Sequence, residues 1–304
     1  MKRKLVKQGA ATMMVSLPSK WIKQNKLDKG DEINLEEKEN NLIITTDQLS
    51  KAKKEITIKI HNDNQHDIKV ILSHAYRRGF DKIILEDVTK EHINVIREAT
   101  EKLLLGFEIT EKSNNRCVIE NISEPQEGKY EVMIKKVFLI TKEQHKLVIE
   151  DFKKNKFNNM KEMEDTKHQQ DRLILFCRRL LAKENLEPTI LEWELLTFIM
   201  HINHSYYYLY KYANENKIKL EKTVFESLDE LEKYFDLFEE AYFNKTINSI
   251  HKINNIKAKH HFGKSLRLIE KSDNPVIHAY IREIFRLIQI GTSPIMGMIL
   301  EKKD

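Results

Sequence analysis

The distribution of glycine constrains the fold of this chain more than any other sequence feature. The eight glycines are Gly9, Gly30, Gly79, Gly106, Gly128, Gly263, Gly291 and Gly297. None falls between residues 129 and 262, and only Pro188 interrupts that stretch. Glycine costs about 1 kcal/mol and proline about 3 kcal/mol in a helix interior, so this gap is typical of long helices. The first 128 residues, with five glycines, predict shorter elements.

Apolar residues in the second half of the chain follow a heptad spacing. They step alternately by four and three positions over residues 191–212, 224–242 and 277–298. Stripes of this kind fit helices that pack at shallow angles in bundles. The spacing predicts six helices, at about residues 130–155, 160–185, 189–216, 223–249, 251–272 and 275–301. Two three-helix bundles in tandem would account for the number.

The first fifty residues indicate a small β unit around one short helix. Met13, Val15 and Leu17 alternate with polar or smaller residues, which is the period of a half-buried strand. Pro18 suits a first helical turn, and the helix is expected to end near Leu27. Residues 28–31 predict a turn in which Gly30 takes positive φ, and strands follow on both sides of a tight turn at residues 40–41. Such a unit buries little surface alone, so dimerisation is expected.

The next segment has the pattern of a small α+β sheet. Strand-like and helix-like stretches alternate as βαβαββ, with a hairpin across residues 114–115. The sequence as a whole therefore predicts an α+β multidomain chain. Its expected domains are a β domain at residues 1–50, a small α+β domain at 54–122 and an all-α region at 126–304.

Charge is concentrated at the N-terminal end. Residues 1–60 hold 13 Lys and Arg against 8 Asp and Glu, whereas the remaining 244 residues balance at 39 against 39. Seven basic residues precede the first carboxylate, Asp28. They are Lys2, Arg3, Lys4, Lys7, Lys20, Lys23 and Lys26. Such asymmetry indicates a nucleic acid or another polyanion as partner.

The order of motifs in this region resembles the AbrB or SpoVT family of swapped-hairpin DNA-binding domains. The shared elements are "KQG", a strand ending in "SLPSKW", the turn "LDKGDEI" and the strand "NNLII", which together cover residues 3–47. The resemblance implies that two chains interleave their hairpins into one dimeric barrel whose basic face lies on double-stranded DNA. The seven basic residues are then the DNA-binding residues. Lysine contacts to phosphates fix the position of a protein on the duplex but do not read the base sequence, and Arg3 is the only arginine among the first fifty residues. Modest sequence specificity is therefore expected.

The helical region resembles the PhoU family of phosphate-signalling proteins. The segments "RRGFDKIIL", "KLLLGFEITEK" and "QQDRLILFCRRLL" resemble parts of archaeal PhoU-type regulators that begin with a SpoVT/AbrB domain. The resemblance spans nearly the whole chain, and the order of the parts supports it more than any single motif. It implies a pair of PhoU-like three-helix bundles and a role in phosphate uptake or metabolism.

PhoU-type bundles are expected to hold metal through acidic pairs four residues apart. In this sequence Asp171 matches such a position, but Lys167 stands four residues before it. In the next helix Asn203 stands where an acidic residue would be expected, and the neighbouring His204 is the one possible metal ligand. In the last helix Gln289 and Ser293 also stand where acidic residues would be expected. His201 and His204 share a helical face that could hold zinc or iron beside a carboxylate. A divalent metal at Asp171, His201 and His204 is therefore one interpretation, and a structural role for these residues is the other.

No catalytic constellation is found in the sequence, so the chain is not expected to be an enzyme. Its two cysteines, Cys117 and Cys177, lie in apolar patterns and indicate a reducing compartment. The start "MKRKLVKQ" lacks the apolar run of a secretory signal, and no stretch of eighteen apolar residues occurs. A cytoplasmic protein without membrane insertion is expected.

The leading hypothesis from the sequence is a dimeric DNA-binding transcriptional regulator with a helical sensor or interaction region. The main alternative is a PhoU-like negative regulator that binds a phosphate transporter or signalling kinase and uses the barrel for dimerisation. A third alternative is an antitoxin, a class that usually follows such a barrel with a short flexible tail. The placement of charge favours the DNA-binding regulator, because a barrel that served only for dimerisation would not need seven uncompensated cations.

Overall fold

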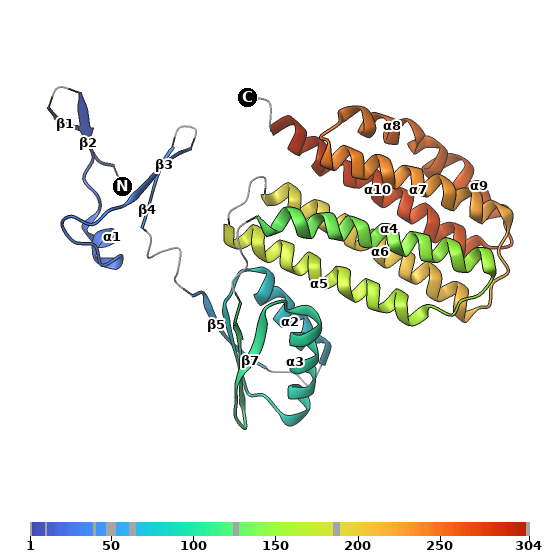
Figure 1. Cartoon of the computed structure of the whole chain (residues 1–304), viewed down its shortest axis with the longest axis horizontal. Helices are drawn as coiled ribbons and strands as arrows, with labels where there is room; N and C mark the ends of the chain where they lie inside the picture. The colour runs from blue at the N-terminus through green and yellow to red at the C-terminus, as the bar shows by residue number, and fades with distance from the viewer. Residues whose placement is uncertain are drawn as a thin grey trace. The chain divides into compact units, whose positions relative to one another are not determined.

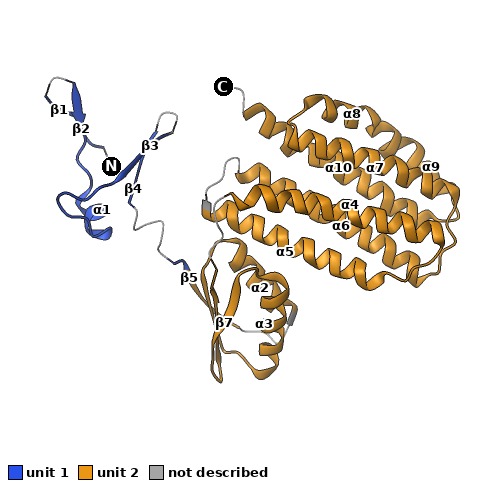
Figure 2. Ribbon diagram, viewed as in Figure 1, with its two compact units in different colours: residues 1–54 blue, residues 55–304 orange. Residues whose placement is uncertain are grey.

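The computed structural model describes residues 2–9, 11–38, 41–46, 53–60, 65–123, 128–184 and 189–301. The chain forms two compact units, unit 1 at residues 1–54 and unit 2 at residues 55–304 (Figure 2). Over the described ranges no helix is both long and apolar enough to cross a membrane.

Unit 1 consists of two short hairpins and one short helix (Figure 1). Its elements are β1 (Val6–Gln8), β2 (Thr12–Met14), α1 (Ser19–Gln24), β3 (Asn34–Lys38) and β4 (Asn41–Thr45). β1 pairs antiparallel with β2, and β3 pairs antiparallel with β4. In the described part of unit 1 the hairpins do not join into one sheet. The predicted small β region is confirmed, and the predicted turn at residues 40–41 lies partly outside the described residues.

Unit 2 begins with a four-stranded mixed sheet and two helices. Its elements are β5 (Glu55–Lys59), α2 (Gln65–Arg77), β6 (Lys82–Glu86), α3 (Lys90–Leu103), β7 (Phe107–Lys112) and β8 (Arg116–Asn121). The strand order is β5-β6-β8-β7, with β5 parallel to β6 and the other pairs antiparallel. Leu72, Ile83, Ile96 and Ile119 are buried between the sheet and its helices. The predicted βαβαββ pattern is confirmed.

The rest of unit 2 is helical. Its elements are α4 (Lys129–Lys154), α5 (Met160–Glu184), α6 (Thr189–Glu215), α7 (Lys222–Phe243), α8 (Ile247–Ala258), a π-helical turn (Lys259–Gly263), α9 (Lys264–Lys271) and α10 (Pro275–Glu301). α4, α5 and α6 pack on one another, α10 packs on α7, α8 and α9, and α6 packs along α10. The predicted helical region is confirmed, and the contact of α6 with α10 joins these helices into one body. The predicted helix at 223–249 divides at residues 244–246, where Lys245 has positive φ.

The sheet layer and the helices pack together within unit 2. Both α2 and α3 contact α5, and Arg179 of α5 forms an ion pair with Asp81 at 2.5 Å. Arg179 is 1% exposed and also donates to the carbonyl oxygens of Tyr76 and Phe80, at 3.1 Å and 2.6 Å. A buried cation is stable only when its donors are satisfied in this way. The segments expected as separate domains at 54–122 and 126–304 thus share one compact unit.

Two glycines on α10 differ in the space around them, and this gives a stability prediction. A Cβ at Gly291 would lie 3.0 Å from the ring of Phe238, which is fully buried. A Cβ at Gly297 would meet the tip of the flexible Leu191 side chain at 2.8 Å. We expect Gly291→Ala to lower the free energy of unfolding by about 1–2 kcal/mol, because overpacking outweighs the gain in helix propensity.

Urea denaturation followed by far-UV circular dichroism would measure this difference, with Gly297→Ala as the matched control. Leu191 can rotate away, so the control should be neutral or stabilising by up to about 1 kcal/mol. Equal stability of Gly291→Ala and wild type would contradict the close packing of α10 on α7.

Candidate nucleic-acid interface

The structure places all seven sequence-predicted basic residues on the surface of unit 1. They are Lys2, Arg3 and Lys4 in the arm before β1, Lys7 on β1, Lys20 and Lys23 on α1, and Lys26 shortly after α1. Every one of these side chains is exposed. In the part of unit 1 that the structure describes, none of them forms an ion pair. Their charges are therefore uncompensated within the unit and open to an anionic partner.

The carboxylates of unit 1 occupy a different part of the sequence. Asp28 and Asp31 lie in the turn after α1, and Glu36 and Glu37 lie on β3. The first hairpin and α1 thus carry only positive charge, whereas the second hairpin carries negative charge. This segregation leaves the basic residues without acidic neighbours in their own hairpin.

Unit 1 has almost no hydrophobic core of its own. Thr46 is the one buried residue among those described in this unit. Large apolar side chains of both hairpins are exposed instead, and they include Leu5, Val6, Met13, Met14, Val15, Leu35, Leu42 and Ile43. Leu35 is 60% and Leu42 is 59% exposed, and they lie on the same face of the second hairpin because Leu35 pairs with Ile44. A single two-stranded hairpin is marginally stable in water, so we expect a partner to cover the exposed apolar side chains of these hairpins.

Local backbone geometry sets the positions of the basic segments. Gly9 has φ +76° in the turn that reverses the chain between β1 and β2, so Lys7 lies opposite Met13. The extended backbone of Pro18 then leads into α1. In the following turn Gly30 has φ +101°, and the Asp28 N–H donates to Oδ2 of Asp31 at 2.7 Å. The predicted turn with positive φ at Gly30 is confirmed.

Unit 1 is thus a small hairpin domain with exposed cations and an exposed apolar surface. Residues 6–56 match the family of MazE bacterial antitoxins, whose description reads "antidote-toxin recognition MazE". The chain therefore has an N-terminal domain of the MazE/AbrB type followed by a largely helical region, as the sequence predicted. No curated protein and no solved structure matches the chain. The family match ends at residue 56 and does not extend to the helices.

The residues singled out for metal binding lie in unit 2, and two of them meet directly. Nε2 of His204 on α6 lies 2.7 Å from Oδ1 of Asp171 on α5. The other oxygen of Asp171 accepts from Lys167 at 2.9 Å. His201 lies beside His204, with 6.2 Å between ring centroids. The part of the chain that the structure describes contains no group of three or more His, Cys, Asp or Glu residues placed to hold a metal ion.

The two histidines line an open pocket between α6 and α10. Its volume is about 400 Å³, and its lining residues are His201, His204, Ser205, Tyr208, Glu283, Arg286 and Leu287. Glu283 is held by Arg286 at 2.8 Å. Burial, followed by the neighbouring charges of His204 and Arg178, lowers the pKa of His201. The carboxylates beside these histidines therefore already have cationic partners.

The contact between Asp171 and His204 gives a pH-dependent prediction. Burial alone would raise the pKa of Asp171, but the hydrogen bond from His204 and the charge of Lys167 lower it overall. A carboxyl group whose pKa is lower in the folded protein than in the unfolded chain stabilises the fold at pH values above its unfolded pKa of about 4. This stabilisation is lost as the pH falls through the pKa of the folded protein. We expect Asp171→Asn to lower the free energy of unfolding by about 1–3 kcal/mol at pH 7.

Urea denaturation of wild type and Asp171→Asn at a series of pH values would test this. The difference between the two proteins should shrink as the pH falls below about 4, where the carboxyl of the unfolded wild-type chain gains its proton, and it should vanish once the folded carboxyl is protonated at lower pH. A difference that stays constant down to pH 2.5 would show that the carboxylate charge plays no part.

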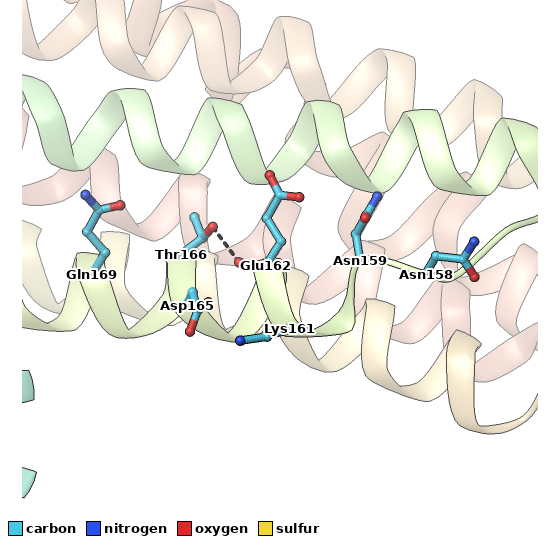
Figure 3. A pocket seen from close by; sticks show the side chains of 7 residues that line it. All are labelled: Asn158, Asn159, Lys161, Glu162, Asp165, Thr166 and Gln169. Atoms are coloured by element: carbon cyan, nitrogen blue, oxygen red, sulfur yellow. Dashed lines mark hydrogen bonds between the residues drawn. The ribbon is translucent and has the colours of Figure 1, made fainter.

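A second open pocket lies at the start of α5. Figure 3 shows its lining side chains, which are Asn158, Asn159, Lys161, Glu162, Asp165, Thr166 and Gln169. Its volume is about 630 Å³. None of the residues predicted from the sequence as DNA or metal ligands belongs to it, and its side chains come almost entirely from one exposed face of α5.

Proposed function

We propose that this protein is a transcriptional regulator that binds double-stranded DNA as a homodimer through unit 1. The observation that carries the proposal is the combination of seven exposed, uncompensated cations with an apolar surface that one chain leaves uncovered. The cations supply the attraction to DNA phosphates. The apolar surface supplies the reason for two copies. The similarity of residues 6–56 to the MazE family supports both parts.

Dimerisation follows from the energetics of the exposed apolar residues. Burying a leucine or valine side chain contributes about 1.5–3 kcal/mol. Val6, Met13, Leu35 and Leu42 are each between 58% and 61% exposed, so a second copy that covered them would contribute several such terms. Two interleaved copies also join the hairpins into a larger sheet, which removes exposed strand edges. The dimer then presents two sets of the seven basic residues.

Binding to DNA would be mainly electrostatic. Lysine ammonium groups contact phosphates as point charges, which position a protein on the duplex without reading bases. Arg3 alone offers a guanidinium for a bidentate contact with guanine. The proposal therefore includes modest sequence specificity, supplemented by the shape of the DNA.

The helical region of unit 2 would then regulate DNA binding. Its two packed groups of helices fit the proposed PhoU-like architecture, and the resemblance noted in the sequence suggests phosphate uptake or metabolism as the regulated process. The alternative is that the helices bind a phosphate transporter or signalling kinase while unit 1 only dimerises. The uncompensated cations favour DNA. A catalytic role is not part of either proposal.

An antitoxin role is a second candidate, because the matching family is described by toxin recognition. Antitoxins with such a domain usually continue as a short flexible tail that binds the toxin. Here residues 55–304 form a compact unit with its own core instead. This observation favours the regulator.

The proposal can be tested by coupling DNA binding to dimerisation. Sedimentation velocity would give the oligomeric state, and fluorescence anisotropy with a labelled 30-base-pair duplex would give the affinity. We expect the wild type to be a dimer that binds, and Leu35→Glu/Leu42→Glu to be a monomer with at least tenfold lower affinity, roughly 1.4 kcal/mol or more. Ile190→Glu, which changes an 82% exposed residue of unit 2, is the matched control. No binding by wild type at low salt would refute the proposal.

A further inference from the structure

Two adjacent buried arginines on α5 have contrasting environments. Arg179, 1% exposed, has the carboxylate of Asp81 and two backbone carbonyl groups as partners. Arg178 is also buried, at 4% exposure, but the one hydrogen bond that it forms within the described residues is to Oγ1 of Thr197, at 2.6 Å. Its Nε is fully buried and has no hydrogen-bond partner. A buried guanidinium without a carboxylate is costly, because its charge has lost water and gained no counter-ion.

Further cationic groups gather around Arg178. Its guanidinium lies over the ring of Trp193 on α6, 5.2 Å from the centroid, and that of Arg77 lies 5.6 Å from the same centroid. Nη2 of Arg77 is 2.9 Å from both ring nitrogens of His74. Three helices, α2, α5 and α6, thus bring His74, Arg77 and Arg178 together around one tryptophan.

The one carboxylate whose charge acts on Arg178, that of Asp171, raises the pKa of Arg178 by less than burial and Arg77 lower it, and it forms no ion pair with Arg178 in the described residues. In the described ranges of the chain, neither Arg77 nor Arg178 takes part in an ion pair. Burial, followed by the positive charge of Arg77, lowers the pKa of Arg178 to about 10. Burial and the charges of Arg77 and Arg178 likewise lower the pKa of His74. The helix dipole at the end of α2 offsets part of the charge of Arg77, whereas Arg178 lies six residues before the end of α5, outside the last turn where this effect acts.

We propose that Arg77 and Arg178, beside Trp193, form a binding site for a small oxyanion, a phosphate or carboxylate group of a free ligand. A guanidinium offers a planar fork of N–H donors that matches both groups. Arg178 would supply the buried guanidinium, and Arg77 would supply a second, half-buried guanidinium. His74 would donate a hydrogen bond from the exposed edge of the site. The bound anion would give Arg178 the counter-ion that Asp81 gives Arg179. The site belongs to unit 2 and does not depend on DNA binding.

The test uses the full chain with Trp21→Phe, so that emission reports Trp193 alone. Inorganic phosphate, and separately citrate, is titrated to roughly 50 mM against chloride at constant ionic strength, a range that detects binding of millimolar strength. We expect a saturable change in Trp193 emission and a higher thermal unfolding midpoint with at least one of the two anions. Binding of phosphate alone or citrate alone identifies the oxyanion group, and both results support the site.

The variants Arg178→Gln and Arg77→Gln should each weaken anion binding at least tenfold. Arg267→Gln, which changes an exposed arginine on α9, is the matched control and should bind like the parent. Circular dichroism in chloride establishes folding, and Arg77→Gln, at the end of α2, tests the site if Arg178→Gln does not fold. The proposal is overturned if neither anion gives a saturable change, or if the variants that fold bind as tightly as the parent.

Discussion

The double charge reversal Lys4→Glu/Lys7→Glu is expected to reduce the affinity for duplex DNA about 1000-fold near physiological salt. Both residues are exposed and form no ion pair in the described part of unit 1, Lys4 in the arm before β1 and Lys7 on β1. Each chain loses two cations and gains two anions, so a dimer loses four phosphate contacts and gains four repulsive charges. At roughly 1 kcal/mol for each lost contact, the total is about 4 kcal/mol, or three factors of ten.

Fluorescence anisotropy with the 30-base-pair duplex measures this loss. Lys135→Glu/Lys136→Glu is the matched control, because it changes net charge equally at two exposed lysines of α4 in unit 2. The control should lose less than about tenfold, through long-range electrostatics alone. If both double variants lost affinity to the same extent, net charge rather than the basic face of unit 1 would govern binding.

The largest expected effect on stability comes from Arg179→Met. The change leaves Asp81, 5% exposed, with Lys183 at 2.6 Å as its other ion-pair partner among the described residues, and removes donors from two carbonyl groups. It also removes the guanidinium from the rings of Tyr76 and Phe107, 5.1 Å and 4.8 Å away. Breaking a buried ion pair in this way costs about 3–5 kcal/mol.

Urea denaturation followed by circular dichroism would measure the loss, with Arg178→Met as the control on the next residue. Arg178 has no carboxylate partner, so replacing it should leave the anion-free protein unchanged within about 1 kcal/mol or stabilise it. The comparison separates the loss of an ion pair from the general effect of an apolar side chain on α5. Similar losses for both variants would contradict the different roles assigned to these neighbours.

Regular elements of this fold could be predicted because their signals are local. The heptad stripe over residues 277–298 predicted α10 well, and the strand and helix periods predicted the succession βαβαββ along the chain. The break between α7 and α8 was predicted near residue 250 and lies at residues 244–246, because the apolar stripe ends at Tyr242 without a glycine or proline to mark the turn. The π-helical turn at Lys259–Gly263 was missed, since Gly263 alone does not distinguish such a turn from a helix end.

Contacts between distant residues were harder to predict. The exposure of the basic residues followed from their sequence, because uncompensated lysines stay in water. Arg179 and Asp81 lie 98 positions apart, and no periodicity links them. The cluster of Arg77, Arg178 and Trp193 was missed for the same reason, although the adjacent arginines of "CRRLL" were a visible signal. Asp171 and His204 were each singled out, but their hydrogen bond required the antiparallel packing of α5 and α6.

The salt dependence of DNA binding tests the central proposal most directly. Two copies of the seven basic residues that precede Asp28 offer fourteen cations, and contact with about ten phosphates predicts a slope of about −9 for the logarithm of the association constant against the logarithm of salt concentration. Anisotropy titrations of the full chain between roughly 50 and 300 mM salt would give this slope. A steep slope that falls to about −5 in Lys4→Glu/Lys7→Glu would support a basic face made by two chains. A slope near zero, or no binding at the lowest salt, would contradict it.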